Sequence, residues 1–162
     1  MNDFYPLVSI VVITYNSSHY VLETLESIKS QTYKNIELIV TDDCSSDDTI
    51  FLCQNWIEKN KSNFVRTKLI TTTCNTGVSA NCNRGCWEAK GEWIKCIAGD
   101  DCLCVDGIEK YIKFILKKLD VFCFFLYAYI VKKNHEPAAE KDVMLMKHSQ
   151  KRTFMDIEKM NS

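Results

Sequence analysis

The chain has 162 residues, a length typical of one domain, which disfavours an enzyme built from two domains. Hydrophobic residues make up 46% of it and charged residues 25%, proportions that exclude disorder of the whole chain. Twenty Lys and Arg against 21 Asp and Glu leave a net charge of −1, so nucleic acid is not an expected partner.

Strand-like apolar runs alternate along the chain with segments of helical periodicity. In the first helical segment Val21, Leu25 and Ile28 recur at helical spacing behind Asn16 or Ser17, and one of these two is the expected N-cap. In chain order we expect a strand at Leu7–Thr14, a helix at Ser18–Ser30, a strand at Ile36–Thr41, a helix after Asp47, a strand at Thr67–Thr73, a helix at Ser79–Ala89, a strand at Trp93–Ile97, a helix at Asp106–Lys118 and a strand at Val121–Val131. This alternation predicts an α/β fold of parallel βαβ units, with helices on both faces of one sheet.

The last third of the chain is less regular. The apolar run Val121–Val131 has eleven residues, whereas a helix that crosses a bilayer needs about 20. We therefore expect a core strand, or at most a patch that faces a membrane. Beyond Lys132 the sequence turns polar and contains Pro137, so residues 132–162 are predicted to form a weakly helical or frayed tail.

The chain has nine cysteines and no basic and apolar leader at its start. We therefore expect reduced thiols in a cytoplasmic protein. Cys82 and Cys86 would lie one helical turn apart, and Cys102 and Cys104 flank one residue, but no second pair matches either in the way a zinc site requires. The cysteines are thus predicted to be buried and structural.

Polar residues follow three of the predicted strands. The first strand ends in Thr14-Tyr15-Asn16, the second in Asp42-Asp43-Cys44-Ser45-Ser46-Asp47, and the fourth in Gly99-Asp100-Asp101. Ligand sites in such sheets lie beyond the carboxyl ends of the strands. Two acidic pairs at one edge repel each other unless a cation or a set of donors lies between them, which favours Mg²⁺ or Mn²⁺ with a nucleoside diphosphate.

Each of these segments also has a purely structural interpretation. Ser45 and Asp47 would serve to cap the second helix, and either acidic pair alone could be a solvated turn. Other nucleotide motifs are missing, because the sequence has neither GxGxxG after the first strand nor a P-loop. The histidines, His19, His135 and His148, lie away from the polar strand ends.

Four motifs together resemble family 2 glycosyltransferases of the GT-A fold. They are SIVVITYN at 9–16, SIKSQTYKNIELIVTDDCSSDDT at 27–49, NTGVSANCNRGCWEAKGEWI at 75–94 and AGDD at 98–101, in the order and spacing of the family. The resemblance covers residues 7 to about 130. It implies a Rossmann-like, mostly parallel sheet, with a nucleotide-sugar-binding core at 1–131 and a truncated acceptor region at 132–162.

The resemblance also implies roles for five residues. Thr14 and Tyr15 would line the base pocket, and Asp43 would accept a hydrogen bond from the imide N–H of the base, which makes UDP-sugars the expected donors. Asp100 would bind ribose or sugar hydroxyls. Asp101 would ligate the Mn²⁺ or Mg²⁺ that neutralises the leaving diphosphate.

Two departures from the family pattern lie close to these residues. Cys82 stands where the family often has Arg, although Arg84 could supply the missing cation. Cys44 replaces the usual glycine after the acidic pair, and this predicts a strained turn with positive φ.

The family's general base is a carboxylate on the acceptor side, after the fifth strand. None of the acidic residues available there lies in a recognisable form of that motif, so the catalytic residue is unassigned. The candidates are Glu136, Glu140, Asp142, Asp156 and Glu158.

The resemblance implies an inverting glycosyltransferase that moves a sugar to a glycan or lipid-linked acceptor, with peripheral contact at the inner face of a membrane. The alternative is a truncated, non-catalytic module that binds nucleotide sugars. A receiver-like signalling domain also gathers acidic residues around Mg²⁺, but it expects its acidic pair after the first strand, which here ends in Thr14-Tyr15-Asn16.

Overall fold

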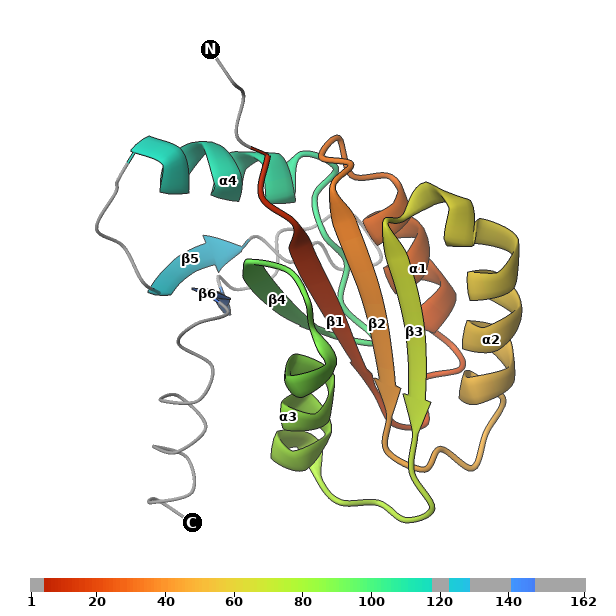
Figure 1. Ribbon diagram of the computed structural model, residues 1–162. Helices are drawn as coiled ribbons and strands as arrows, with labels where there is room; N and C mark the ends of the chain where they lie inside the picture. Colours follow the sequence, from red (N-terminus) through yellow and green to blue (C-terminus); the bar gives the residue numbers. More distant parts are fainter. Residues whose placement is uncertain (1–4, 118–122, 129–140, 148–162) are drawn as a thin grey trace.

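The computed structural model describes residues 5–117, 123–128 and 141–147 (Figure 1). The described strands form one sheet in the order β3-β2-β1-β4-β6-β5. The strands are β1 (Val8–Thr14), β2 (Ile36–Asp42), β3 (Arg66–Thr71), β4 (Trp93–Ala98), β5 (Cys123–Ala128) and β6 (Lys141–Lys147). The first four run parallel, whereas β6 is antiparallel to both β4 and β5.

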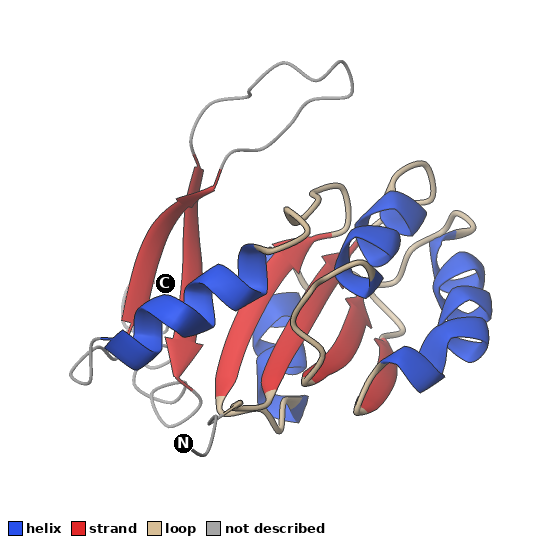
Figure 2. Cartoon of the chain, turned by 90° about the horizontal axis from the view of Figure 1, so that it is seen from above, coloured by secondary structure: helices blue, strands red, loops and turns tan. Residues whose placement is uncertain are grey.

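Helices cover both faces of the parallel strands (Figures 1 and 2). Alternate residues of β1 separate the two layers, because Ile10 and Val12 pack with α1, α2 and α4, whereas Val11 packs with α3. All seven residues of β2 are buried, as expected of a strand with helices on both sides. The helices are α1 (Val21–Lys29), α2 (Thr49–Asn60), α3 (Val78–Glu88) and α4 (Gly107–Lys117), and Lys61–Asn63 forms a 3₁₀ turn. The predicted α/β class and mostly parallel sheet are confirmed.

The end of the chain differs from the sequence prediction. Residues 141–147 form β6, so the expected weak helix or frayed tail is wrong for this segment. The apolar stretch Val143–Met146 pairs with β4 and β5, contacts that no local periodicity reveals. Figure 2 shows β5 and β6 side by side at one edge of the sheet. The rest of 132–162 lies outside the described residues.

The start of α1 also differs. Its N-cap is Tyr20, which makes no side-chain capping bond, so neither Asn16 nor Ser17 caps the helix through its side chain. The backbone carbonyl of Ser17 instead accepts the amides of Tyr20 and Val21. No helix of the described segments is long and apolar enough to cross a membrane.

The strand register brings three polar strand ends together. Thr14 of β1 lies opposite Asp42 of β2, and Ile13 lies opposite Ala98 of β4, so the loops that follow these strands share one edge. Gly85 brings α3 close to the same strands, because a Cβ atom there would lie 2.3 Å from Cγ1 of Val11. A larger residue at this position would push the helix off the sheet.

Candidate nucleotide-binding site

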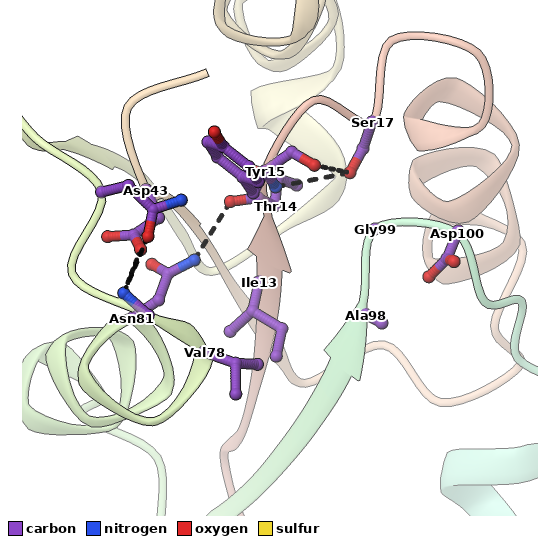
Figure 3. A pocket seen from close by; sticks show the side chains of 12 residues that line it. Ile13, Thr14, Tyr15, Ser17, Asp43, Val78, Asn81, Ala98, Gly99 and Asp100 are labelled. Atoms are coloured by element: carbon purple, nitrogen blue, oxygen red, sulfur yellow. Dashed lines mark hydrogen bonds between the residues drawn. The ribbon is translucent and has the colours of Figure 1, made fainter.

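A pocket of about 270 Å³ opens at the carboxyl edge of the sheet, between β1, β4 and the start of α3 (Figure 3). It combines an apolar wall with polar groups from the strand ends. Its lining residues are Ile13, Thr14, Tyr15, Ser17, Asp43, Asn75, Gly77, Val78, Asn81, Ala98, Gly99 and Asp100. A concave mixed surface at this edge is the arrangement expected of a small-molecule site in an open α/β sheet.

Thr14 is the last residue of β1 and Tyr15 follows it. Both line the pocket, but their side chains differ in exposure and in hydrogen bonding. Thr14 is buried, and its hydroxyl donates to the Asp42 carboxylate over 2.8 Å. Tyr15 is 51% exposed, with its backbone amide 3.4 Å from the Ser17 hydroxyl. Thr14 therefore fixes the strand end, whereas the Tyr15 ring is available to a ligand.

The turn after β2 contains the strain that its sequence predicts. Cys44 has φ +68°, the left-handed conformation for which glycine is the usual residue, so that expectation is confirmed. The Asp42 carboxylate accepts the Ser45 amide at 2.8 Å and the Ser45 hydroxyl at 2.5 Å, and these bonds hold the turn. The amide of Asn16 donates to the same hydroxyl over 2.8 Å, which ties the loop after β1 to the turn.

Asp47 precedes Asp48, the N-cap of α2, so it is not the cap itself but holds the turn that leads into this helix. Its carboxylate accepts the amide of Thr49, the first residue of α2, at 3.0 Å and the amide of Ser18 at 3.1 Å. Desolvation works to raise its pKa, but hydrogen bonds from Thr49 and Ser18 lower the pKa of Asp47 to about 2. Ser45 does not cap α2, because its hydroxyl donates to Asp42.

Asp43 is 2% exposed and is saturated by donors of its own chain. One carboxylate oxygen accepts the amides of Thr76 at 2.8 Å and Gly77 at 2.7 Å, at the N-terminus of α3. The other accepts the Thr76 hydroxyl at 2.6 Å and the guanidinium of Arg84 at 3.2 Å. Desolvation opposes the charged form, but these bonds lower the pKa of Asp43, so the group is an anion.

Asn81 and Arg84 fasten α3 to the strand ends. The Asn81 amide group donates to the carbonyl of Thr14 over 3.1 Å, and its oxygen accepts the Thr41 hydroxyl at 2.7 Å. Arg84 donates to that same oxygen over 2.9 Å and also contacts Asp43. Its guanidinium is thus beside the pocket but outside the lining, where Asp43 offsets its charge.

The second acidic pair has a different environment. Asp100 is exposed and lines the pocket, whereas Asp101 is half-buried and lies next in the chain, outside the lining. Among the described residues, none forms a hydrogen bond or ion pair with either carboxylate. Gly99 lets this loop approach β1, because a Cβ atom there would lie 2.7 Å from Cγ2 of Thr14.

The two acidic pairs, Asp42-Asp43 and Asp100-Asp101, therefore differ in how far the protein itself satisfies them. Donors of the protein already surround Asp42 and Asp43, so neither fits as a metal ligand. The oxygens of Asp100 and Asp101 stay available, and oxygen donors of this kind suit Mg²⁺ or Mn²⁺. Of the two acidic pairs in the described part of the chain, the one at the end of β4 thus fits a divalent cation.

The structure brings Thr14, Tyr15, Asp43 and Asp100 to one pocket, with Asp101 just outside it. Sequence reasoning missed the part of the pocket that α3 and the loop before it supply, namely Asn75, Gly77, Val78 and Asn81. The rule that directed attention to strand ends could have found it, because this segment follows β3 at the same edge.

The acidic residues considered for the catalytic base cannot be placed in the pocket. Glu136, Glu140, Asp156 and Glu158 lie outside the described residues, and for Asp142 in β6 only the backbone is described. The catalytic residue stays unassigned.

The prediction of buried cysteines is wrong at three positions, because Cys74, Cys102 and Cys104 are exposed. They lie in loops, where no strand or helix face covers them. Cys82 does not face the pocket either, although it occupies the position where a cation was expected. Its sulfur lies 3.4 Å from that of Cys96 in β4.

Comparison with known proteins gives a consistent result. The profile of the family described as glycosyl transferase family 2 matches residues 9–161. An uncharacterized glycosyltransferase of Haemophilus influenzae is 37% identical over 124 residues, which are 76% of this chain and 48% of that protein. The chain is also 32% identical to the Escherichia coli UDP-Glc:alpha-D-GlcNAc-diphosphoundecaprenol beta-1,3-glucosyltransferase WfgD, over 80% of this chain and 48% of WfgD.

Among solved structures, Staphylococcus aureus TarS 1-349 in complex with UDP is similar, with a TM-score of 0.60 and 29% identity. The match covers 68% of this chain and 32% of that one. The chain spans about half the length of the curated relatives just described.

Proposed function

The chain belongs to glycosyltransferase family 2, and on that premise we propose that it is the donor-binding part of an inverting glycosyltransferase. The donor is a nucleoside diphosphate sugar, expected to be UDP-linked, and the acceptor is a hydroxyl of a glycan or a lipid-linked glycan. In the reaction, the acceptor oxygen attacks the anomeric carbon in line as the nucleoside diphosphate leaves.

The observation that carries this proposal is the convergence of Thr14, Tyr15, Asp43 and Asp100 on one pocket. The exposed Tyr15 ring, with Ile13 and Val78, offers an apolar surface on which a base can stack (Figure 3). The base would lie toward Asp43, and the ribose and diphosphate would extend toward Asp100.

Recognition of the base by Asp43 requires an exchange of donors. A carboxylate has about four lone-pair sites, and four donors of the protein already occupy those of Asp43. Of these donors, the Thr76 hydroxyl belongs to an exposed side chain that can rotate away. We expect a pyrimidine imide N–H to replace this hydroxyl and to find an acceptor that is already ionised.

Asp101, with Asp100 beside it, is the proposed ligand of Mn²⁺ or Mg²⁺. Such an ion supplies positive charge to the diphosphate as negative charge builds on it during bond cleavage. The residues of this chain would position the ion at the end of β4, next to the pocket.

The relatives support the choice of donor. The TarS structure contains UDP, and the name of WfgD describes a UDP-Glc donor and a diphosphoundecaprenol acceptor. We extend these two properties to the present chain as a proposal, together with work at the cytoplasmic face of a membrane.

A second candidate is a non-catalytic module that binds nucleotide sugars. It is kept because no described residue is assigned as the base. Assays of donor hydrolysis and sugar transfer separate the two functions, because turnover above the buffer rate requires a catalytic site and binding alone does not.

Calorimetric titration of UDP, with and without Mn²⁺, tests the proposed site. We expect Mn²⁺ to raise the affinity for UDP at least tenfold, and Asp101→Ala to remove that increase. Asp48→Ala is the matched control, because Asp48 is an exposed acid at the same edge and makes no side-chain capping bond. Equal affinity of the wild type and Asp101→Ala in Mn²⁺ would contradict the role of Asp101.

A further inference from the structure

Three cysteines outside the pocket meet between α3 and the sheet. Cys82 and Cys86 lie one turn apart on α3, and Cys96 lies on β4. The sulfur of Cys96 is 3.4 Å from that of Cys82 and 3.3 Å from that of Cys86, and the two helix sulfurs are 4.0 Å apart. Gly85, where no larger residue fits, allows α3 to approach the strands this closely.

The triangle of sulfurs has the dimensions of a metal-binding face. Its three sides give a circumscribed radius of about 2.1 Å, so an ion about 1 Å above its plane lies about 2.3 Å from every sulfur. That distance is the usual Zn–S bond length, and the offset resembles that of one face of a coordination tetrahedron.

We infer that Cys82, Cys86 and Cys96 form a binding site for a thiophilic d¹⁰ cation, here tested with Zn²⁺ and Cd²⁺. The cation forms three metal–sulfur bonds, and each thiol that becomes a thiolate releases its proton to water. Cys82 and Cys96 are partly exposed, so solvent can supply a fourth ligand.

The surroundings distinguish this group from exposed cysteines elsewhere in the chain. Cys86 is fully buried in an apolar cluster with Val11, Ile39 and Ile94, against which the other two cysteines pack. Thiolates without a cation would be costly in such a place.

The competing explanation is that three thiols serve only as small apolar side chains, as buried cysteines often do. A bound cation differs in two measurable ways. It gives a sulfur-to-metal charge-transfer absorption, and it links α3 to β4, which raises the midpoint of thermal unfolding (Tm). This inference does not depend on the proposed function.

The test is a titration of the reduced, metal-stripped protein with Cd²⁺, followed by near-ultraviolet absorption. A variant that lacks the exposed thiols, Cys74→Ser/Cys102→Ser/Cys104→Ser, serves as the control. We expect the wild type and the control each to show charge-transfer absorption with an end point at one equivalent. Cys96→Ser should weaken binding at least tenfold and remove about a third of the absorption.

A second readout guards against a variant that folds poorly. Equimolar Zn²⁺ should raise the Tm of the wild type by several degrees. It should raise the Tm of Cys82→Ser, which changes a partly exposed side chain, by much less. Either of two results of the Cd²⁺ titration would overturn the inference: no end point at one equivalent in the control, or full Cd²⁺ affinity in Cys96→Ser. Air oxidation of two of the three cysteines to a disulfide in the presence of equimolar Zn²⁺ would also overturn it, because bound thiolates are protected.

Discussion

The two ends of the parallel sheet both contain acidic residues. They differ in how far donors of the protein itself satisfy the described carboxylates. At the amino end, Glu37 of β2 is fully buried among donors of the chain itself. At the carboxyl end, Asp42 and Asp43 are satisfied in the same way, whereas no described residue donates to Asp100 or Asp101. A carboxylate without donors from its own protein is directly available to a ligand, whereas Asp43 would have to exchange a donor before it could contact one.

The donors around Glu37 show how completely the protein satisfies a buried carboxylate at the amino end. The Glu37 carboxylate accepts Arg66 at 2.5 Å, the amide of Lys90 at 2.8 Å, and the hydroxyl of Ser9. Arg66 also pairs with Glu88 at the end of α3. Desolvation works to raise the pKa of Glu37, but the bonds from Lys90, Ser9 and Arg66 lower it. The network joins three strands and a helix and leaves no acceptor for a ligand.

The largest effect on stability is expected from removing the Glu37 carboxylate at the amino end of the sheet. Glu37→Ala leaves the Ser9 hydroxyl, the Lys90 amide and a partly buried Arg66 without their acceptor, so we expect a loss of about 3 kcal/mol in the free energy of unfolding. Urea denaturation measures this loss. The UDP affinity of the protein that stays folded should not change.

Glu58→Ala is the matched control for this change, because Glu58 forms only an exposed ion pair with Lys61. It should alter the stability by less than about 0.5 kcal/mol. Equal losses of stability in the two variants would show that the buried network around Glu37 contributes no more to stability than an exposed ion pair does.

A smaller loss of stability is expected from removing the Asn81 side chain, which is hydrogen-bonded to other residues at the carboxyl end. Asn81→Ala removes the partners of the Thr14 carbonyl, the Thr41 hydroxyl and Arg84, at a cost of about 2 kcal/mol. Because Asn81 also lines the pocket, UDP affinity should fall together with stability. Paired denaturation and calorimetry check both, and a loss of stability at constant affinity would remove Asn81 from the site.

Asp100, at the same edge, should show the opposite pattern, in which a substitution lowers UDP affinity and leaves stability nearly unchanged. Asp100→Asn removes a charge that no described residue pairs with, so stability should change by less than about 0.5 kcal/mol. UDP affinity in Mn²⁺ should fall about tenfold, which corresponds to about 1.4 kcal/mol. The same two measurements apply. A marked loss of stability in this variant would mean that Asp100 belongs to a structural network after all.

The smallest effect concerns pH. The pKa of Asp47 is lowered to about 2 in the folded chain, so its contribution to stability is fully present above about pH 4 and is lost as the pH falls toward 2. The difference in Tm between the wild type and Asp47→Asn should shrink across that window. A difference that stays constant from pH 5 to pH 2 would contradict the assignment, and the effect is small because Asp47 is exposed.

Much of the site could be predicted because strand ends obey a simple rule. Thr14, Tyr15, Asp43 and Asp100 each follow a recognisable apolar run, and parallel strands bring such ends to one edge. The positive φ of Cys44 was expected because the resemblance places a glycine at this position. These features depend on local sequence.

The remaining features depend on packing between distant segments. Asn81 reaches the pocket because Gly85 brings α3 close to the sheet. The sequence around these two residues does not indicate this contact. The cysteine cluster was missed for the same reason, because Cys96 lies on a strand that meets the helix only in the folded chain. β6 likewise exists through its pairing with β4 and β5.

A crystal structure of the protein with UDP and Mn²⁺ tests the central claim most directly. Our account predicts the pyrimidine between Tyr15 and Asp43, with the diphosphate beside Asp100 and the metal on Asp101. Nucleotide density elsewhere, or a metal held by Asp42 or Asp43 in place of Asp101, would contradict it.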